Sequence, residues 1–276
     1  MIGVVTAPTP YADLNDLLDR FVRGAQTALG ENFCGAYLQG SFAVGDADEY
    51  SDVDFIVLTT DEITDDQQTA LQEMHARMYE LETPWAQHLE GSYIPRGRIR
   101  HVDPTRAPYF YLDNGASRLE WDNHCNTAIV RWSLREHGLV LAGPEIKTLV
   151  DPVTAGQLRA DVREAMRECR AFAHQSQERF EVPGEGRPGM SRWKQQFLIQ
   201  WFCRALHTLE SGVVTSKKES GEWALDALGP QWSGLVQQAL DDRPEPWQRV
   251  HQAADAERIA HTLAFVDYAL DRAGLP

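Results

Sequence analysis

The sequence has few cysteines and no long apolar run. Without a CxxC pair, four widely separated cysteines predict buried thiols in a reducing cytoplasm rather than a zinc site or a disulfide framework: Cys34, Cys125, Cys169 and Cys203. A stretch of about eighteen apolar residues, the length of a transmembrane helix, does not occur. Residues 1–10 lack the basic and apolar regions of a secretory signal. We therefore expect a cytoplasmic protein without membrane contact.

Positively charged residues are outnumbered: 26 lysines and arginines stand against 41 aspartates and glutamates, which gives a net charge of −15. A protein that binds nucleic acid through its phosphates usually presents a basic face, so we expect no nucleic-acid partner. An acidic protein can still bind a nucleotide through metal ions and a few cations, and it attracts a polycationic small molecule. The same charge is equally compatible with a role in solubility alone.

The chain is long enough for two domains, at 276 residues of which 43% are hydrophobic. Apolar spacing predicts a helix over 12–29, strands over 34–38, 52–59, 87–94 and 139–142, and a helix over 126–137. Proline and glycine then break the chain, and helical patterns follow over 155–177, 193–209, 216–228 and 257–273. The sequence predicts an α/β (α+β) domain with a small mixed sheet over 1–154. An all-α helical bundle over 155–276 should follow it, and we expect a monomer.

The most informative motif begins with Gly40 and Ser41 after one strand and ends with Asp52 and Asp54 at the start of the next. Strand alternation puts both carboxylates on one face, roughly 7 Å apart, where they can share hard cations that bind triphosphate oxygens. Gly40 lets the backbone approach phosphates closely, and Ser41 can donate a hydrogen bond. The motif predicts a Mg²⁺ and nucleotide site that includes Ser51; an acidic surface loop is the alternative.

Glu90 is the candidate for a third carboxylate. It shares a predicted strand face with His88 and Ser92. The nearest competitors, Glu80 and Glu82, fall at a helix end. An exposed strand glutamate without a function is the alternative interpretation.

Two cations in the second half of the chain form another candidate site. Lys217 is the first residue of a predicted helix that follows Ser216. A cation at a helix N-terminus is unfavourable because of the helix dipole, and an anion bound there would remove the conflict. Arg204 lies off the apolar stripe of the preceding helix. Plain surface charge remains the alternative for both residues.

The spacing of Gly40-Ser41, ten residues, then Asp52-x-Asp54 resembles the nucleotidyltransferase superfamily related to DNA polymerase β. Further segments resemble the streptomycin/spectinomycin (aminoglycoside) adenylyltransferase branch: Gly138–Pro144, Asp151–Val153, Cys203-Arg204, and 211–217 continuing to Glu222-Trp223. The resemblance implies an enzyme that transfers AMP from ATP to a hydroxyl of a small, cationic molecule. It implies Glu90 as the base and as a third acid beside the metal, Arg204 and Lys217 on the β- and γ-phosphates, and ATP in a cleft between the domains.

The acceptor remains open. Trp121 and Asp122 can supply a stacking face and an anion for a cationic sugar, and the resemblance weakly implies the tryptophan. In the streptomycin enzymes, the helix before the Cys-Arg pair begins with acidic residues that face the drug. Lys194, Gln195 and Gln196 stand there in this chain, which favours a spectinomycin-like or unrelated acceptor. A second hypothesis is a regulatory or antitoxin-like module that has the nucleotidyltransferase fold but modifies a protein, or only binds one.

Overall fold

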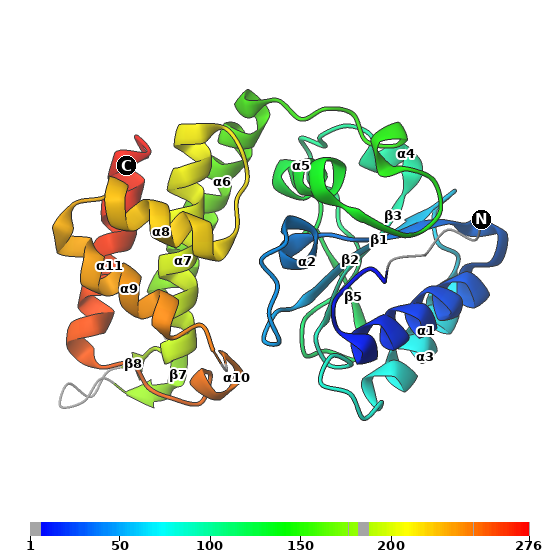
Figure 1. Ribbon diagram of the computed structural model, residues 1–276, viewed down its shortest axis with the longest axis horizontal. Helices are drawn as coiled ribbons and strands as arrows, with labels where there is room; N and C mark the ends of the chain where they lie inside the picture. The colour runs from blue at the N-terminus through cyan, green and yellow to red at the C-terminus, as the bar shows by residue number, and fades with distance from the viewer. Residues whose placement is uncertain (1–6, 176, 182–187, 245, 276) are drawn as a thin grey trace. The chain divides into compact units, whose positions relative to one another are not determined.

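The computed structural model describes residues 7–175, 177–181, 188–244 and 246–275. Its backbone divides into two compact units, Met1–Val153 and Thr154–Pro276 (Figure 1). The N-terminal unit mixes helices with strands, and the C-terminal unit is dominated by helices.

Helices and strands alternate along the N-terminal unit. In chain order they are α1 (Ala12–Leu29), η1 (Gly30–Asn32), β1 (Phe33–Leu38), α2 (Gly40–Val44), β2 (Val53–Thr59), α3 (Asp65–Tyr79), β3 (Leu89–Pro95), α4 (Arg96–Ile99), β4 (Tyr109–Leu112), β5 (Leu119–Asp122), α5 (Ala128–His137), β6 (Leu139–Ala142) and η2 (Ile146–Thr148). The six strands lie in the order β5-β4-β3-β2-β1-β6. Only β2 and β3 run parallel, and the other neighbours are antiparallel. The predicted mixed sheet is confirmed.

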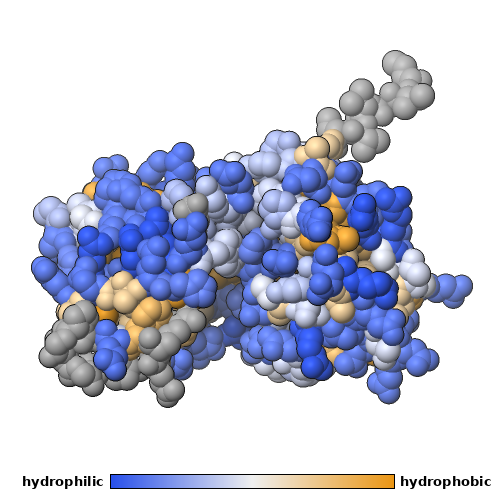
Figure 2. Space-filling model, turned by 90° about the horizontal axis from the view of Figure 1, so that it is seen from below, coloured by the Kyte–Doolittle hydropathy of each residue, from blue (hydrophilic) through white to orange (hydrophobic). Residues whose placement is uncertain are grey.

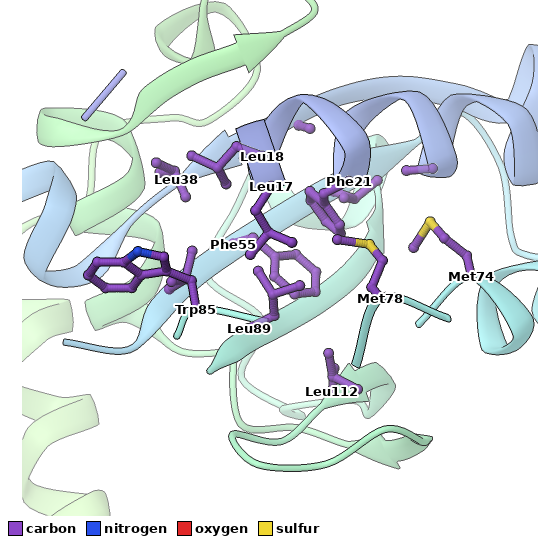
Figure 3. Close-up of a cluster of buried hydrophobic side chains, with 14 of the residues drawn as sticks. Leu17, Leu18, Phe21, Leu38, Phe55, Met74, Met78, Trp85, Leu89 and Leu112 are labelled. Atoms are coloured by element: carbon purple, nitrogen blue, oxygen red, sulfur yellow. The ribbon is translucent and has the colours of Figure 1, made fainter. Parts of the chain in front are cut away.

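Helices α1 and α3 pack together over one face of this sheet (Figure 1). Figure 3 shows Leu17 and Phe21 of α1 directed toward Phe55 of β2, and the rings of Phe21 and Phe55 lie 4.6 Å apart. These residues are fully or nearly fully buried, so the three- and four-residue spacing of α1 is the spacing of its core face.

The opposite face of the sheet carries a second core. Ile56 and Leu58 of β2 pack there with Leu134 of α5. Strand β2 is therefore buried on both faces, as its continuous apolar run predicts.

Two helix ends follow the sequence signals closely. Helix α1 ends at Gly30, which has a φ of 56° that favours glycine. Helix α3 begins with a complete capping box between Thr64 and Gln67.

The C-terminal unit is built around one central helix. Its elements are α6 (Ala155–His174), β7 (Gln177–Glu181), β8 (Pro188–Gly189), α7 (Arg192–Ser211), α8 (Lys217–Ala227), η3 (Pro230–Trp232), α9 (Ser233–Asp241), α10 (Pro246–Arg249) and α11 (Ala256–Arg272). Helix α7 packs against α6, α8, α9 and α11. The predicted helical domain is confirmed, and the two-stranded sheet β7–β8 is an addition to it. The sequence is rich in glycine and proline over 181–190, which predicts a loop, and residues 182–187 of it lie outside the described residues.

Besides the three 3-10 helices, several short elements have no counterpart in the sequence prediction: α2, α4, β4, β5, β7, β8, α9 and α10. Strands β4 and β5 are four residues long each, too short for an alternating pattern to stand out.

Across the described ranges, no helix combines the length and the apolar character needed to cross a membrane. The molecular face in Figure 2 is mostly hydrophilic, with small hydrophobic areas between charged and polar residues.

Candidate functional site

Three carboxylates lie together where β2 and β3 begin. The parallel register pairs Asp54 directly with Glu90, and Asp52, two residues before Asp54, shares its face because side chains alternate along a strand. The Glu90 side chain is 14% exposed. The sheet thus brings together the two strands that carry the predicted acids.

Gly40 lies against this group because its backbone approaches Asp54 closely. The amide of the preceding residue, Gln39, donates to the Asp54 carbonyl at 2.9 Å. Gly40 has a φ of 64°, and a Cβ at this position would overlap the Asp54 carboxylate. A side chain is therefore excluded there by space and by backbone conformation. Ser41 follows Gly40 in the short helix α2 and is half-buried.

Ser51 has a different environment from Ser41. Its buried hydroxyl donates to the Asp48 carboxylate at 3.0 Å and accepts from the Asp48 amide at 3.0 Å. These bonds stabilise the turn before β2, so the structure gives the Ser51 side chain a local role.

A layer of polar side chains that the sequence did not indicate surrounds the carboxylates. Asn114 Nδ2 donates to Asp52 Oδ1 at 2.6 Å, and Asn114 Oδ1 lies 3.1 Å from His88 Nδ1. Tyr111 donates to Glu90 Oε1 at 2.8 Å, and His124 Nε2 lies 3.1 Å from the same oxygen. All of these except His88 come from β4 or from the turns after β4 and β5, the part of the chain that the sequence pattern left unassigned.

Two of these side chains have shifted pKa values. Burial, together with the charge of Glu90, raises the pKa of the Tyr111 hydroxyl far above its ordinary value, so it remains a donor. The hydrogen bond to Glu90 raises the pKa of His124, against the opposing effect of burial, and the charges of Glu90, Asp54 and Asp122 act in the same direction as that bond. The site therefore concentrates the negative charge of three carboxylates, and hydrogen-bond donors from Asn114, Tyr111 and His124 contact these carboxylates.

Strand β5 separates the two residues predicted for the acceptor. Its register pairs Asp122 with Tyr109, and Trp121 with Phe110. Tyr109 belongs to the core on the carboxylate face, whereas Phe110 packs on the opposite core. Trp121 is 57% exposed, with its ring 4.5 Å from that of Phe110. The sheet places Asp122 on the face of Glu90 and Trp121 on the other face.

The two predicted phosphate ligands lie in the C-terminal unit. Arg204 is half-buried on α7, and Lys217 is the exposed first residue of α8. Ser216 caps α8 by accepting from the Glu219 amide at 3.0 Å, which is one half of a capping box. The Glu219 carboxylate instead accepts from the Thr215 hydroxyl.

The segment that is acidic in the streptomycin enzymes is buried in this structure. Lys194, 1% exposed, donates from Nζ to the Gln175 carbonyl at 2.6 Å and lies over the Phe172 ring. Gln195 donates to Thr262 of α11 at 3.0 Å. These side chains stabilise the helical unit from inside.

The donor set of the carboxylate group fits Mg²⁺, a hard cation that prefers oxygen ligands. Within the described ranges, no three His, Cys, Asp or Glu side chains are grouped closely enough to hold an ion by themselves.

Comparisons with known proteins agree with this geometry. Residues 31–89 match the nucleotidyltransferase domain family. Residues 184–271 match the family of the aminoglycoside adenylyltransferase C-terminal domain. No curated protein sequence matches significantly.

The fold is similar to the crystal structure of spectinomycin adenyltransferase AAD(9) from Enterococcus faecialis with ATP and spectinomycin. The TM-score is 0.68 at 13% sequence identity, covering 93% of this chain and 98% of the other. The chain has the fold of that enzyme over nearly its whole length and the domain signatures of both halves. The chain therefore contains a nucleotidyltransferase domain and a domain similar to the C-terminal domain of the aminoglycoside adenylyltransferases.

Proposed function

We propose that this protein transfers AMP from ATP to a hydroxyl group of an aminoglycoside or aminocyclitol such as spectinomycin. One observation carries the proposal: Asp54 and Glu90 are paired across β2 and β3, with Asp52 on the same face, in a chain that matches both domain families. The similar enzyme was crystallised with ATP and spectinomycin.

The reaction needs a base and groups that stabilise the leaving pyrophosphate. The acceptor oxygen attacks the α-phosphorus of ATP in line, and the bond from that phosphorus to the oxygen bridging to the β-phosphate breaks. Glu90 takes the proton of the acceptor hydroxyl. Ser41, Arg204 and Lys217 bind phosphate oxygens and stabilise the charge that moves onto pyrophosphate.

Asp52 and Asp54 would hold Mg²⁺, with Glu90 as a further ligand. Bound there, the ion would neutralise triphosphate charge and polarise the α-phosphoryl group. Gly40 supports this role because the absence of a side chain leaves the Asp54 carboxylate in place.

The acceptor is proposed to be small and cationic. Asp122 lies on the carboxylate face of the sheet, and the net charge of −15 attracts cations. Trp121 was the predicted stacking residue, but it pairs with Phe110 on the sheet face opposite the carboxylates, so we do not propose it as an acceptor contact. Lys194 and Gln195 are engaged inside their unit, so this segment offers no acid to streptomycin, and spectinomycin is the preferred candidate.

The second candidate, a regulatory or antitoxin-like module that acts on a protein, is not favoured: the C-terminal match is to aminoglycoside adenylyltransferases, and the three carboxylates argue for catalysis. A monomeric state and the absence of a nucleic-acid partner remain predictions from the sequence.

The test is a survey of acceptors with ATP labelled at the α-phosphate in the presence of Mg²⁺. The panel contains spectinomycin, streptomycin, other aminoglycosides and uncharged polyols. We expect labelled AMP on spectinomycin, with binding that weakens as salt screens the acidic site. Label on no acceptor would overturn the transferase proposal, and label on a protein would favour the regulatory module.

A further inference from the structure

Glu90 is held by two side chains that lie outside its own strand. The Tyr111 hydroxyl lies 2.8 Å from Oε1, with Asp113 Oδ1 as a second, longer acceptor at 3.0 Å, and His124 Nε2 lies 3.1 Å from Oε1. Tyr111 is 3% exposed, whereas the His124 side chain is 60% exposed. One partner is therefore fixed in the core, and the other reaches the carboxylate from the solvent side.

The two partners also support each other. The Tyr111 and His124 rings stack with centroids 5.1 Å apart and an interplanar angle of 25°. Tyr111 is fixed by the sheet, because its backbone pairs with Ser92 two residues beyond Glu90. The His124 amide donates to the Asp122 carboxylate at 2.7 Å. Both rings are thus held in place by the protein itself.

We propose that Tyr111 and His124 are positioning residues that hold the Glu90 carboxylate in the orientation needed to take the acceptor proton. A glutamate carboxylate rotates readily about its last side-chain bond, and proton transfer requires it to lie within hydrogen-bond reach of the hydroxyl. Two donors on Oε1 restrict that rotation before the acceptor arrives. The inference rests on the proposed function, since Glu90 is the base there.

The same strand offers a matched control. Tyr109 lies two residues before Tyr111 on β4 and is also buried, and its hydroxyl has no hydrogen-bond partner among the described residues. Tyr111→Phe and Tyr109→Phe each remove one buried hydroxyl from the same face of the same strand. Only the first removes a bond to Glu90.

We expect Tyr111→Phe to lower kcat by roughly 10- to 100-fold, the scale for losing a group that orients a reacting ligand, while KM for ATP and for the acceptor stays within about 3-fold. Tyr109→Phe should keep the wild-type kcat. His124→Gln, which retains a donor, should be more active than His124→Phe, which retains only a ring. Equal kcat losses in the two tyrosine variants, or a loss confined to KM, would contradict the proposal.

A structural measurement decides the inference even where no acceptor is found. High-resolution crystal structures should show one Glu90 orientation in the wild type and in Tyr109→Phe, and a rotated or split carboxylate in Tyr111→Phe combined with His124→Phe. An unmoved carboxylate in that double variant would overturn the positioning role. Absence of transfer by the wild-type protein would instead overturn the proposed function.

Discussion

Two groups of buried polar side chains, one in each unit, have different partners. In the N-terminal unit, polar side chains of β4 and of the turn after it bond to the carboxylates of the candidate site, as Tyr111 and Asn114 do. In the C-terminal unit, polar groups lie within the central helix α7, and they bond to neighbouring helices, as Gln195 and Gln200 do.

The difference shows that polar character by itself does not identify a functional residue. Gln200 donates to the Ala239 carbonyl of α9 at 2.8 Å, which satisfies a buried group and ties two helices together. Lys194 is used similarly. A strand end leaves side chains directed beyond the core, so polar groups gathered there are available for chemistry. Substitutions in the two units should accordingly separate catalysis from stability.

The largest loss of activity is expected from Asp54→Asn. Removing a metal-binding charge should reduce transfer about 10³-fold or more, since several kcal/mol of charge stabilisation disappear. Stability should change little, because like charges brought together at a site oppose folding. Steady-state kinetics with a thermal melt measures both. Glu49→Gln, at an exposed position in the preceding loop, is the control, and full activity of Asp54→Asn with Mg²⁺ would refute the metal site.

Glu90→Gln tests whether the residue is the base or only a metal ligand. A base role predicts a loss of roughly 10²–10⁴-fold in kcat with nucleotide affinity nearly kept. A ligand role predicts weaker binding of Mg²⁺ and ATP together. Calorimetry with ATP·Mg²⁺, beside turnover measurements, separates the two roles. Glu80→Gln is the control, since Glu80 is exposed at the end of α3; an unchanged kcat in Glu90→Gln would place the base elsewhere.

Lys217→Ala tests whether a residue of the C-terminal unit binds the phosphates of ATP. Loss of one charged hydrogen bond to a phosphate should weaken ATP binding by roughly 1.5–3 kcal/mol, with a much smaller effect on AMP, which lacks the β- and γ-phosphates. Lys218→Ala changes the adjacent exposed lysine of the same helix and should leave both affinities unchanged. Titration calorimetry that gives equal losses for ATP and AMP would argue against this role.

His75 allows the stability of the N-terminal core to be tested by pH. Burial lowers the pKa of His75 from 6.5 to about 3, so only the unfolded chain takes up this proton between these values. Protonation of His75 in the unfolded chain should therefore lower the free energy of unfolding by roughly 1.4 kcal/mol for each pH unit below 6.5. The effect should level off near pH 3. His75→Gln removes the effect. Urea unfolding at pH 7, 6 and 5 should give a flatter profile for the variant, and parallel profiles would contradict the assignment.

The smallest effect is expected from Lys194→Met. A methionine can fill the space over Phe172, and replacing a buried charge by an apolar side chain is often neutral or stabilising. We expect a change in unfolding free energy below about 1 kcal/mol and the same acceptor preference as the wild type. A changed ranking of spectinomycin and streptomycin in the acceptor panel would show that Lys194 reaches the drug.

The sequence predicted the helices and strands whose patterns are long or sharply bounded. Helix α1 has the predicted bounds, because its apolar spacing is regular and Gly30 ends it. Strand β2 was recognisable from four consecutive apolar residues. Strands β4 and β5 were missed because their stability depends on pairing with β3 and with each other, which leaves almost no local signal.

For the candidate site, the sequence by itself determined the carboxylates, because two acids at alternate positions of a strand must share a face. The resemblance to the nucleotidyltransferase superfamily indicated Glu90. Only the tertiary structure decided that Asn114, Tyr111 and His124 bond to those acids. It likewise decided that Trp121 faces away from Asp122. The physical reason is that alternation and helical spacing are local properties of the chain, whereas a hydrogen bond between residues 21 or more positions apart depends on strand order and register.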